Sequence, residues 1–375
     1  MSESFGLFAS GLLFGYQVIL MPLFLLSIDP LLETYEILEL LALLCVCSSI
    51  GRLLGLYLLN QRIHKRPKYA LLFLLFTLFY LYSVCDSIII LTVSNSLHGF
   101  VMSFLEGHIL FEKQRYIGFV IGNTSVALIV FLFFPSQESP LQSASFASYV
   151  NSINIACQCC LSIVAVAECM YNASLKSKSS TYEDELGGAL IETSDTPLLC
   201  FLNRAHVAMV FSCLPISLYL PVDRGGFGVS PHTFSGILAL SSFTALIIAA
   251  IQQSIFLSSE KVPYNFHGIS LGAFCLCIIL LRDGTKGSFL PLLLVSLLIT
   301  TSLIAYLTCR TVSSIPSLPA SSTRYIYLAE LVGGSLSLYL LSLLFGDQGI
   351  SKHNSFICAP FLVATVINAV AMLMR

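Results

Sequence analysis

The chain consists of long apolar runs separated by short polar segments. A helix of about 20 apolar residues crosses the hydrocarbon core of a bilayer, which is about 30 Å thick. The polar segments contain helix terminators such as Asp29-Pro30 and Pro135. The pattern predicts an all-α, multi-pass membrane protein with about twelve spans: 5–27, 37–59, 69–92, 94–111, 116–134, 147–170, 206–221, 234–257, 266–281, 288–309, 325–345 and 355–374.

The boundary between the third and fourth spans is the least distinct of these. Only Ser94-Asn95 interrupts the apolar character of this region, so the pattern places the break there. Asp86 then falls inside the third span, where an aspartate costs about 2.5–3.5 kcal/mol at a helix centre.

Composition agrees with this pattern. Of 375 residues, 56% are hydrophobic and 10% are charged, against about 25% charged in soluble domains, and the mean hydropathy is +0.88. These values exclude a soluble globular protein, a disordered chain and a nucleic-acid-binding protein. The net charge of −2 indicates no particular partner. Most of the 13 cysteines lie in apolar runs, where free thiols pack as small hydrophobic groups.

The distribution of basic residues predicts the orientation. Cytoplasmic loops of membrane proteins are enriched in Lys and Arg. With a cytoplasmic N-terminus, 14 of the 18 basic residues fall in cytoplasmic loops and 4 fall outside. This assignment counts Arg52 and Arg204 as loop residues. It places both termini and the polar stretch 171–205 in the cytoplasm, and it does not indicate which cellular membrane holds the protein.

The polar stretch divides the chain into two halves of six spans each. The predicted domains are a first bundle at 1–171, a cytoplasmic linker at 172–205 and a second bundle at 206–375. The tripeptide Arg-Tyr-Ile opens the fifth span of each half, at 115–117 and 324–326. Two repeats of this kind are typical of transporters.

With these features the chain resembles the major facilitator superfamily. The loop from Gly55 to Arg66 stands where that family has a glycine, acidic and basic motif, although Asn60 or Leu59 replaces the aspartate. Arg115, Gly118 and Gly122 are similar to the basic residue and glycines of the family's fifth helix. The resemblance implies two six-helix bundles around a central cavity. It also implies a secondary transporter that moves a small solute by alternating access.

Other function classes stay open at this stage. The region 329–337 looks like the glycine- and serine-rich part of equilibrative nucleoside transporters, which have eleven spans and an aspartate and arginine that 234–257 lacks. A non-transporting membrane scaffold or receptor is a third possibility. An enzyme is not expected, because the chain has no H-E-x-x-H motif and no pair of intramembrane aspartates. Neither a cofactor nor a metal is expected.

Polar residues inside the predicted spans are the candidates for a transport pathway. Glu106 shares its span with His98 and His108, and Glu330 lies in the eleventh span. Carboxylates and histidines of this kind can carry protons across a membrane. Each has a structural alternative: Glu106 can lie at the interface if its span ends early, and Glu330 can reach the interface from its span.

Three uncharged residues complete the set of pathway candidates. Tyr16 and Gln17 lie near the middle of the first span, and Asn123 lies in the fifth. Amides and phenols in membrane bundles often only join helices, with about 0.6 kcal/mol per hydrogen bond. The family resemblance, in which the first and fourth helices of each half line the cavity, favours Tyr16, Gln17, His98 and Glu106.

The scarcity of charges predicts the substrate class. With Arg and Lys assigned to loops, strong binding of phosphate or a dicarboxylate is difficult to arrange. The expected partners are therefore a small neutral or weakly charged solute, a coupling proton and the lipid bilayer.

Overall fold

The computed structural model describes residues 3–28, 32–60, 68–106, 115–134, 146–176, 197–220, 226–255, 261–280, 289–313, 328–345 and 359–374. Every regular element in these ranges is a helix. The first half contains α1 (Glu3–Ile28), α2 (Thr34–Asn60), α3 (Lys68–Ser83), α4 (Ile88–Glu106), α5 (Arg115–Phe133) and α6 (Phe146–Lys176).

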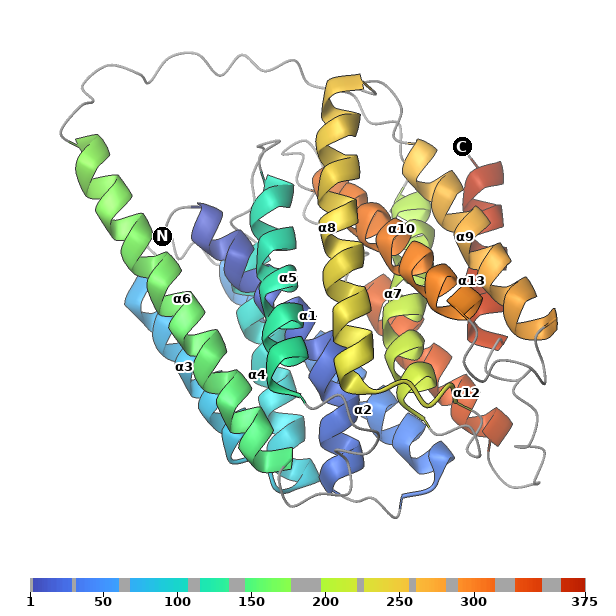
Figure 1. The fold of residues 1–375 in the computed structure, drawn as a ribbon, viewed down its shortest axis with the longest axis horizontal. Coiled ribbons are helices and arrows are strands. Elements are labelled where there is room, and N and C mark those ends of the chain that lie inside the picture. Colours follow the sequence, from blue (N-terminus) through green and yellow to red (C-terminus); the bar gives the residue numbers. More distant parts are fainter. Residues whose placement is uncertain are drawn as a thin grey trace.

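The second half contains six helical rods in the described ranges. They are α7 (Pro197–Tyr219), α8 (Pro231–Ile255), α9 (Lys261–Leu280), α10 (Phe289–Ser313), a composite rod at 328–345 and α13 (Ala359–Leu373). The composite rod joins a helical turn at 328–331 to the π-helix η3 (Val332–Leu336) and to α12 (Ser337–Phe345). We refer to it as the η3–α12 rod. Figure 1 shows the first half on the left and the second on the right.

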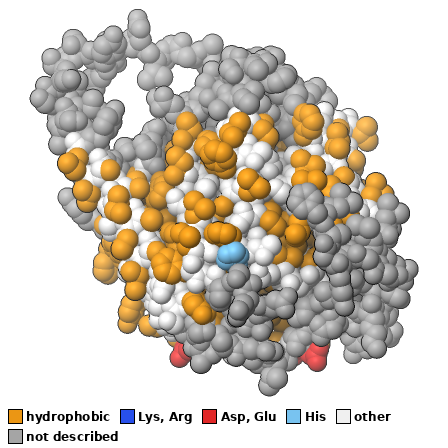
Figure 2. Space-filling model, in the orientation of Figure 1, with side chains coloured by type: hydrophobic (Ala, Val, Ile, Leu, Met, Phe, Trp, Pro, Cys, Tyr) orange, Lys and Arg blue, Asp and Glu red, His pale blue; other side chains and the backbone are white. Residues whose placement is uncertain are grey.

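The surface of the described helices is apolar. Five helices are long and apolar enough to cross a membrane, and seven further described segments are shorter apolar helices. Side chains such as Phe73, Ile89 and Leu132 are at least 70% exposed. Figure 2 shows hydrophobic side chains over most of the described part of one face, with acidic side chains at its lower edge. This is the surface of a multi-pass membrane protein, because lipid surrounds apolar side chains without cost.

The two halves repeat the same order of helix contacts. In the first half α1 packs on α5, α2 on α4, and α3 on α6. In the second half α7 packs on η3, α8 on α10, and α9 on α13. The halves meet through α5 with α8, and through α2 with the η3–α12 rod. Six-helix units with equivalent contacts and equivalent places in the chain form the fold that the sequence predicted.

Glycines allow the closest helix approach within each half. A Cβ on Gly122 of α5 would overlap the backbone of Phe8 in α1. A Cβ on Gly333 of η3 would overlap the backbone of Ala205 in α7. The first and fifth helices of both halves are therefore joined through a glycine, as expected for small residues in membrane bundles. Arg324, which was expected to correspond to Arg115, lies outside the described residues.

The structure moves the predicted break between the third and fourth spans. The two helices are separated at 84–87, and Asp86 lies exposed in this break rather than inside a span. Ser94 and Asn95, which were expected to separate the spans, are buried within α4. The expectation was wrong because protein surrounds this polar pair, so it does not need water to be stable.

The predicted linker is also shorter than expected at both ends. Residues 172–176 belong to α6, and residues 197–205 belong to α7. Arg204 therefore lies inside a helix that spans the bundle, and Arg52 lies inside α2 in the same way. Both had been assigned to loops. Their position inside helices places two positive charges in the lining of the cavity between the halves.

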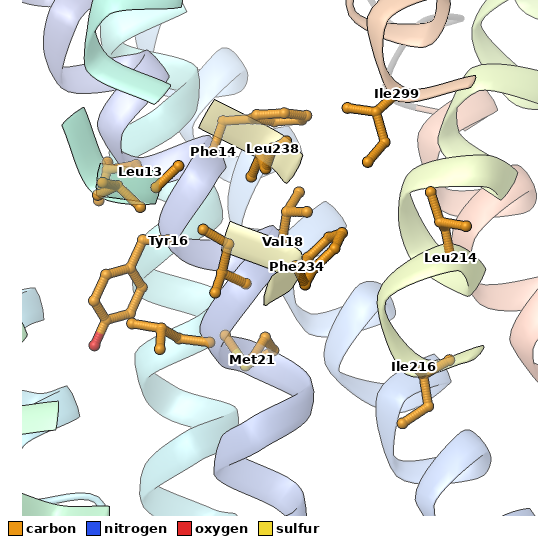
Figure 3. Packing of buried hydrophobic residues seen from close by; sticks show 14 of the residues in the cluster. Leu13, Phe14, Tyr16, Val18, Met21, Leu214, Ile216, Phe234, Leu238 and Ile299 are labelled. Carbon is orange, nitrogen blue, oxygen red and sulfur yellow. The ribbon is translucent and has the colours of Figure 1, made fainter. Parts of the chain in front are cut away.

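Apolar packing fills the interior around α1. Figure 3 shows Leu13 and Tyr16 on one side of α1, and Phe14 and Val18 on the other side, toward α7 and α8. All four side chains are at least 93% buried. The helix is therefore covered on both sides, and only one strip of it reaches the cavity between the halves.

Candidate functional site

A cavity of about 120 Å³ lies between the two halves. It is bounded by α1, α2 and Asn95 of α4 from the first half, and by α7, Tyr306 of α10 and the η3–α12 rod from the second half. Its lining residues are Phe14, Gln17, Val18, Met21, Pro22, Leu41, Leu44, Cys45, Ser48, Ser49, Arg52, Asn95, Arg204, Ala208, Phe211, Ser212, Pro215, Tyr306, Glu330 and Leu338.

Three ionised side chains meet in this lining, and we refer to them as the charged triad. Arg52 of α2 donates from Nη1 to Oε2 of Glu330. Arg204 of α7 donates from Nε to Oε1 of the same carboxylate at 2.7 Å, and also from Nη2. The side chains of Arg52, Glu330 and Arg204 are 7%, 14% and 2% exposed. The carboxylate therefore joins one guanidinium from its own half to one from the other half.

Arg204 is held by two further contacts with α10. Its Nη1 donates to the backbone oxygen of Tyr306 at 3.3 Å. The guanidinium carbon lies 3.7 Å from the centre of the Tyr306 ring, within the range of a cation–π interaction. These contacts fix the guanidinium plane, so that Arg204 presents an ordered row of donors to Glu330.

The triad lies at one end of the cavity. Along α2 the lining runs from Leu41 to Arg52, which is roughly 16 Å at 1.5 Å per residue. Arg204 stands at the same end because α7 begins there and runs back toward Pro215. Toward the opposite end, Tyr219 of α7 donates to the backbone oxygen of Ile19 in α1 at 3.1 Å. Contacts between the halves therefore lie at both ends of the cavity.

Asn95 lines the cavity and has a buried hydrogen-bond acceptor beside it. Its Nδ2 donates to the backbone oxygen of Leu44 at 2.5 Å, which identifies the other amide atom as the oxygen. That Oδ1 is buried and accepts no hydrogen bond from any described residue. A buried acceptor without a partner costs about 1–3 kcal/mol, which a bound molecule with a donor group can recover.

Two of the residues predicted from the sequence line the cavity. Glu330 is the carboxylate of the triad, and Gln17 lies in the same cavity on α1. Tyr16 points away from it and donates to Oδ1 of Asn154 in α6 at 2.7 Å. His98 is fully buried within the first half, where its Nδ1 lies 3.2 Å from the Tyr82 hydroxyl.

The other two predicted residues do not lie in the cavity lining. Asn123 donates to the hydroxyl of Ser242 at 2.8 Å, which joins α5 to α8 across the two halves. Glu106 is the last residue of α4, and its side chain lies outside the described residues, as does His108.

The polar lining residues that sequence reasoning missed include Arg52, Arg204 and Asn95. The premise that no arginine lies inside a span is wrong, because Arg52 and Arg204 fall within the spans Thr34–Gly55 and Phe201–Tyr219. A signal was present in the chain for one of the two arginines. Arg52 has apolar or small residues on both sides, whereas Arg204 stands next to Asn203 and close to His206, as a loop arginine would.

A pair of substitutions on α1 distinguishes helix joining from cavity lining. We expect Tyr16→Phe to lower stability by only about 0.6 kcal/mol, because one hydrogen bond to Asn154 is lost. Uptake should stay within about twofold. Gln17→Leu should instead change the substrate KM severalfold, because this side chain lines the cavity. Thermal unfolding and uptake kinetics of both variants test this; a folded Tyr16→Phe protein without uptake would contradict it.

Comparison with known proteins supports the architecture. No family model and no curated protein matches the chain. Among solved structures, a partially occluded inward-open xylose transporter XylE from E. coli has a TM-score of 0.62 at 11% identity, over 97% of each chain. A D-xylose-proton symporter has a TM-score of 0.62 at 13% identity, over 99% of this chain and 96% of its own.

A third neighbour transports a different kind of cargo. It is described as a bacterial metal transporter, with a TM-score of 0.53 at 15% identity, over 100% of this chain and 97% of its own. Identities this low establish the fold and leave the substrate open. The full coverage agrees with the paired helix order of the two halves, and the chain has the major facilitator-type fold of two six-helix bundles around a central cavity.

Proposed function

We propose that the protein is a secondary transporter that moves a small solute by alternating access. The observation that carries the proposal is the ion pair between Arg52 and Glu330, which joins the two halves at one end of a cavity between them. The cavity is closed at that end while the ion pair is formed, and it opens there when the ion pair breaks. The transporters among the structural neighbours support the same class.

The division of the triad between the halves makes opening less costly. When the halves separate, Arg52 leaves with α2, and Arg204 and Glu330 remain together in the second half. Removing the last partner of a buried charge costs about 3–5 kcal/mol. Because Arg204 stays paired with Glu330, that cost is avoided on the carboxylate, and Arg52 enters a cavity that has filled with water.

The charged triad lies on the cytoplasmic side in the orientation that we propose. In Figure 1 both termini and the last described residues of α6 lie toward the upper side of the molecule. The excess of basic residues in the corresponding loops favours this side as the cytoplasm. Protease protection of a tag placed in the 171–205 stretch tests this orientation; digestion from the outside would contradict it.

A coupling proton is part of the proposal. Glu106 and Glu330 are the two carboxylates that the sequence nominates for it. We expect Glu106→Gln to abolish accumulation driven by a pH gradient if Glu106 carries the proton, while exchange of substrate for substrate continues. Unchanged accumulation would remove Glu106 from this role and leave Glu330.

A reversible cross-link tests alternating access at the triad. A Cβ at position 334 would lie 3.6 Å from Sγ of Cys45 in α2, and 2.9 Å from the Ser212 hydroxyl, which must rotate away. In a protein whose other cysteines are replaced by serine, Gly334→Cys should therefore form a disulfide with Cys45 on oxidation. That disulfide ties α2 to η3.

We expect oxidation to stop uptake in proteoliposomes and reduction to restore it. The uptake panel contains nucleosides, sugars, amino acids and small organic acids, with and without a pH gradient. The matched control carries Gly334→Cys together with Cys45→Ser, and oxidation should leave it active. Full cross-linking with undiminished uptake would show that α2 and the η3–α12 rod need not separate, and would overturn the proposal.

A further inference from the structure

We infer that the cavity takes a small organic anion that also carries a hydroxyl group, such as a short hydroxy acid. This deepens the proposed function and rests on it for the step of transport, although the binding itself does not depend on that step. Three observations carry the inference: the charge of the lining, the acceptor atom of Asn95 and the size of the cavity.

The charge of the lining favours an anion. Among the described residues that line the cavity, the ionised side chains are the two guanidiniums of Arg52 and Arg204 and the one carboxylate of Glu330, so this part of the lining carries a net charge of +1. Guanidinium groups bind carboxylates and phosphates through paired N–H donors. A monoanion in the cavity therefore neutralises the lining, whereas a cation or a dianion does not.

Binding of the anion at the triad would also affect the contact between the two halves. A substrate carboxylate beside Arg52 competes with Glu330 for the same guanidinium. Glu330 retains its hydrogen bond from Nε of Arg204 at 2.7 Å when that competition succeeds. Anion binding thus weakens the contact between the halves, which links the presence of substrate to the opening of the cavity.

Asn95 specifies the second group of the ligand. Its Nδ2 is engaged by the backbone oxygen of Leu44, so its Oδ1 can only accept. A rotation of the Asn95 side chain brings this buried atom to the cavity, where a ligand satisfies it with an O–H or N–H group. A hydroxyl is compatible with the net charge of a monoanion, whereas an ammonium group would restore the positive charge of the occupied cavity.

The size of the cavity limits the ligand to a few carbon atoms. A volume of about 120 Å³ is well below the roughly 300–1,000 Å³ of pockets for drug-sized molecules. Phe14, Val18 and Met21 supply an apolar wall on α1 beside the polar groups. A short carbon chain with a carboxylate and a hydroxyl fits this combination, and a nucleoside does not.

Binding to the purified protein tests the inference without requiring transport. The probes are lactate, propionate, glycerol 3-phosphate, glycerol and xylose, measured by calorimetry at neutral pH. We expect lactate to bind about three- to tenfold more tightly than propionate, which lacks the hydroxyl. Glycerol and xylose, which lack the charge, should bind at least about tenfold more weakly than lactate. Glycerol 3-phosphate, which is mostly a dianion at neutral pH, should bind more weakly than lactate, and tighter binding would overturn the preference for a monoanion.

Two kinds of variant separate the hydroxyl site from the anion site. Asn95→Leu should remove the preference for lactate over propionate and leave propionate affinity within about twofold. Asn151→Leu, at an exposed position on α6, is the matched control and should keep the preference. Arg52→Gln combined with Glu330→Gln keeps the net charge at +1 and frees Arg204 from Glu330 to hold the anion in place of Arg52, so anion binding should persist. Arg204→Gln leaves Arg52 paired with Glu330 at a net charge of zero and should lose anion binding. If Arg204→Gln does not fold, Arg204→Lys, which keeps the charge, is measured in its place.

The outcomes distinguish this inference from the proposed function. Uptake of xylose without binding of lactate would overturn the inference and leave the transporter. Lactate binding that survives Asn95→Leu with its preference intact would remove Asn95 from the site and overturn the inference. Binding of lactate without uptake of any probe would support the inference and overturn the transporter. Absence of lactate binding at millimolar concentration overturns the inference directly.

Discussion

Replacing Glu330 with Gln is expected to lower the initial rate of uptake at least about a hundredfold. The glutamine oxygen can accept from one guanidinium, but its amide N–H groups then face the other, which is also a donor. Breaking a buried ionic contact in this way costs about 3–5 kcal/mol. The side chains involved are at most 14% exposed, so bulk water does not replace the lost partner in the closed state.

The measurement is uptake in proteoliposomes together with the unfolding temperature of the purified protein. We expect the unfolding temperature to fall by about 5 °C or more. Adding Arg52→Gln to Glu330→Gln should recover most of this loss, because the unsatisfied guanidinium is then removed, and the two effects should be clearly non-additive. Glu33→Gln, at an exposed position before α2, is the matched control and should behave as wild type. Additive losses would contradict direct coupling between Arg52 and Glu330.

Gly333→Leu is expected to have a comparably large effect through steric overlap. A Cβ at this position meets the backbone of Ala205, which follows Arg204 in α7. Backbone atoms cannot rotate away as a side chain can, so η3 must move off α7. Glu330 lies one turn before Gly333, and the displacement therefore also separates it from Arg204. We expect the yield of folded protein to fall at least about tenfold, and the remaining protein to lack uptake.

Fluorescence-detected gel filtration and uptake measure this effect. Gly272→Leu in α9 is the matched control, since no atom lies within 4 Å of a Cβ there. Gly122→Leu should reduce folding as well, because the same overlap occurs with Phe8 in the first half. A well-folded Gly333→Leu protein with normal uptake would show that α7 and η3 do not need to be this close.

Much of the architecture follows from the sequence alone. Apolar length identifies the spans because hydrocarbon excludes polar backbone and side chains over a fixed thickness. The long polar stretch near the middle divides the spans into two sets of six, and the small residues predict close helix packing. These properties depend on segments taken one at a time, and the structure has the two six-helix bundles that they indicate.

The site required the tertiary structure. Arg52 and Glu330 are separated by 278 residues, and their meeting depends on which faces of α2 and the η3–α12 rod pack together. The count of basic residues assigned Arg52 and Arg204 to loops, although the apolar span predicted at 37–59 contains Arg52. Hydropathy placed Asn95 at a break between spans, because it measures the cost of a polar group in lipid. Inside a bundle that cost is removed by partners on other helices, so only the packed structure shows that these three residues lie around one cavity.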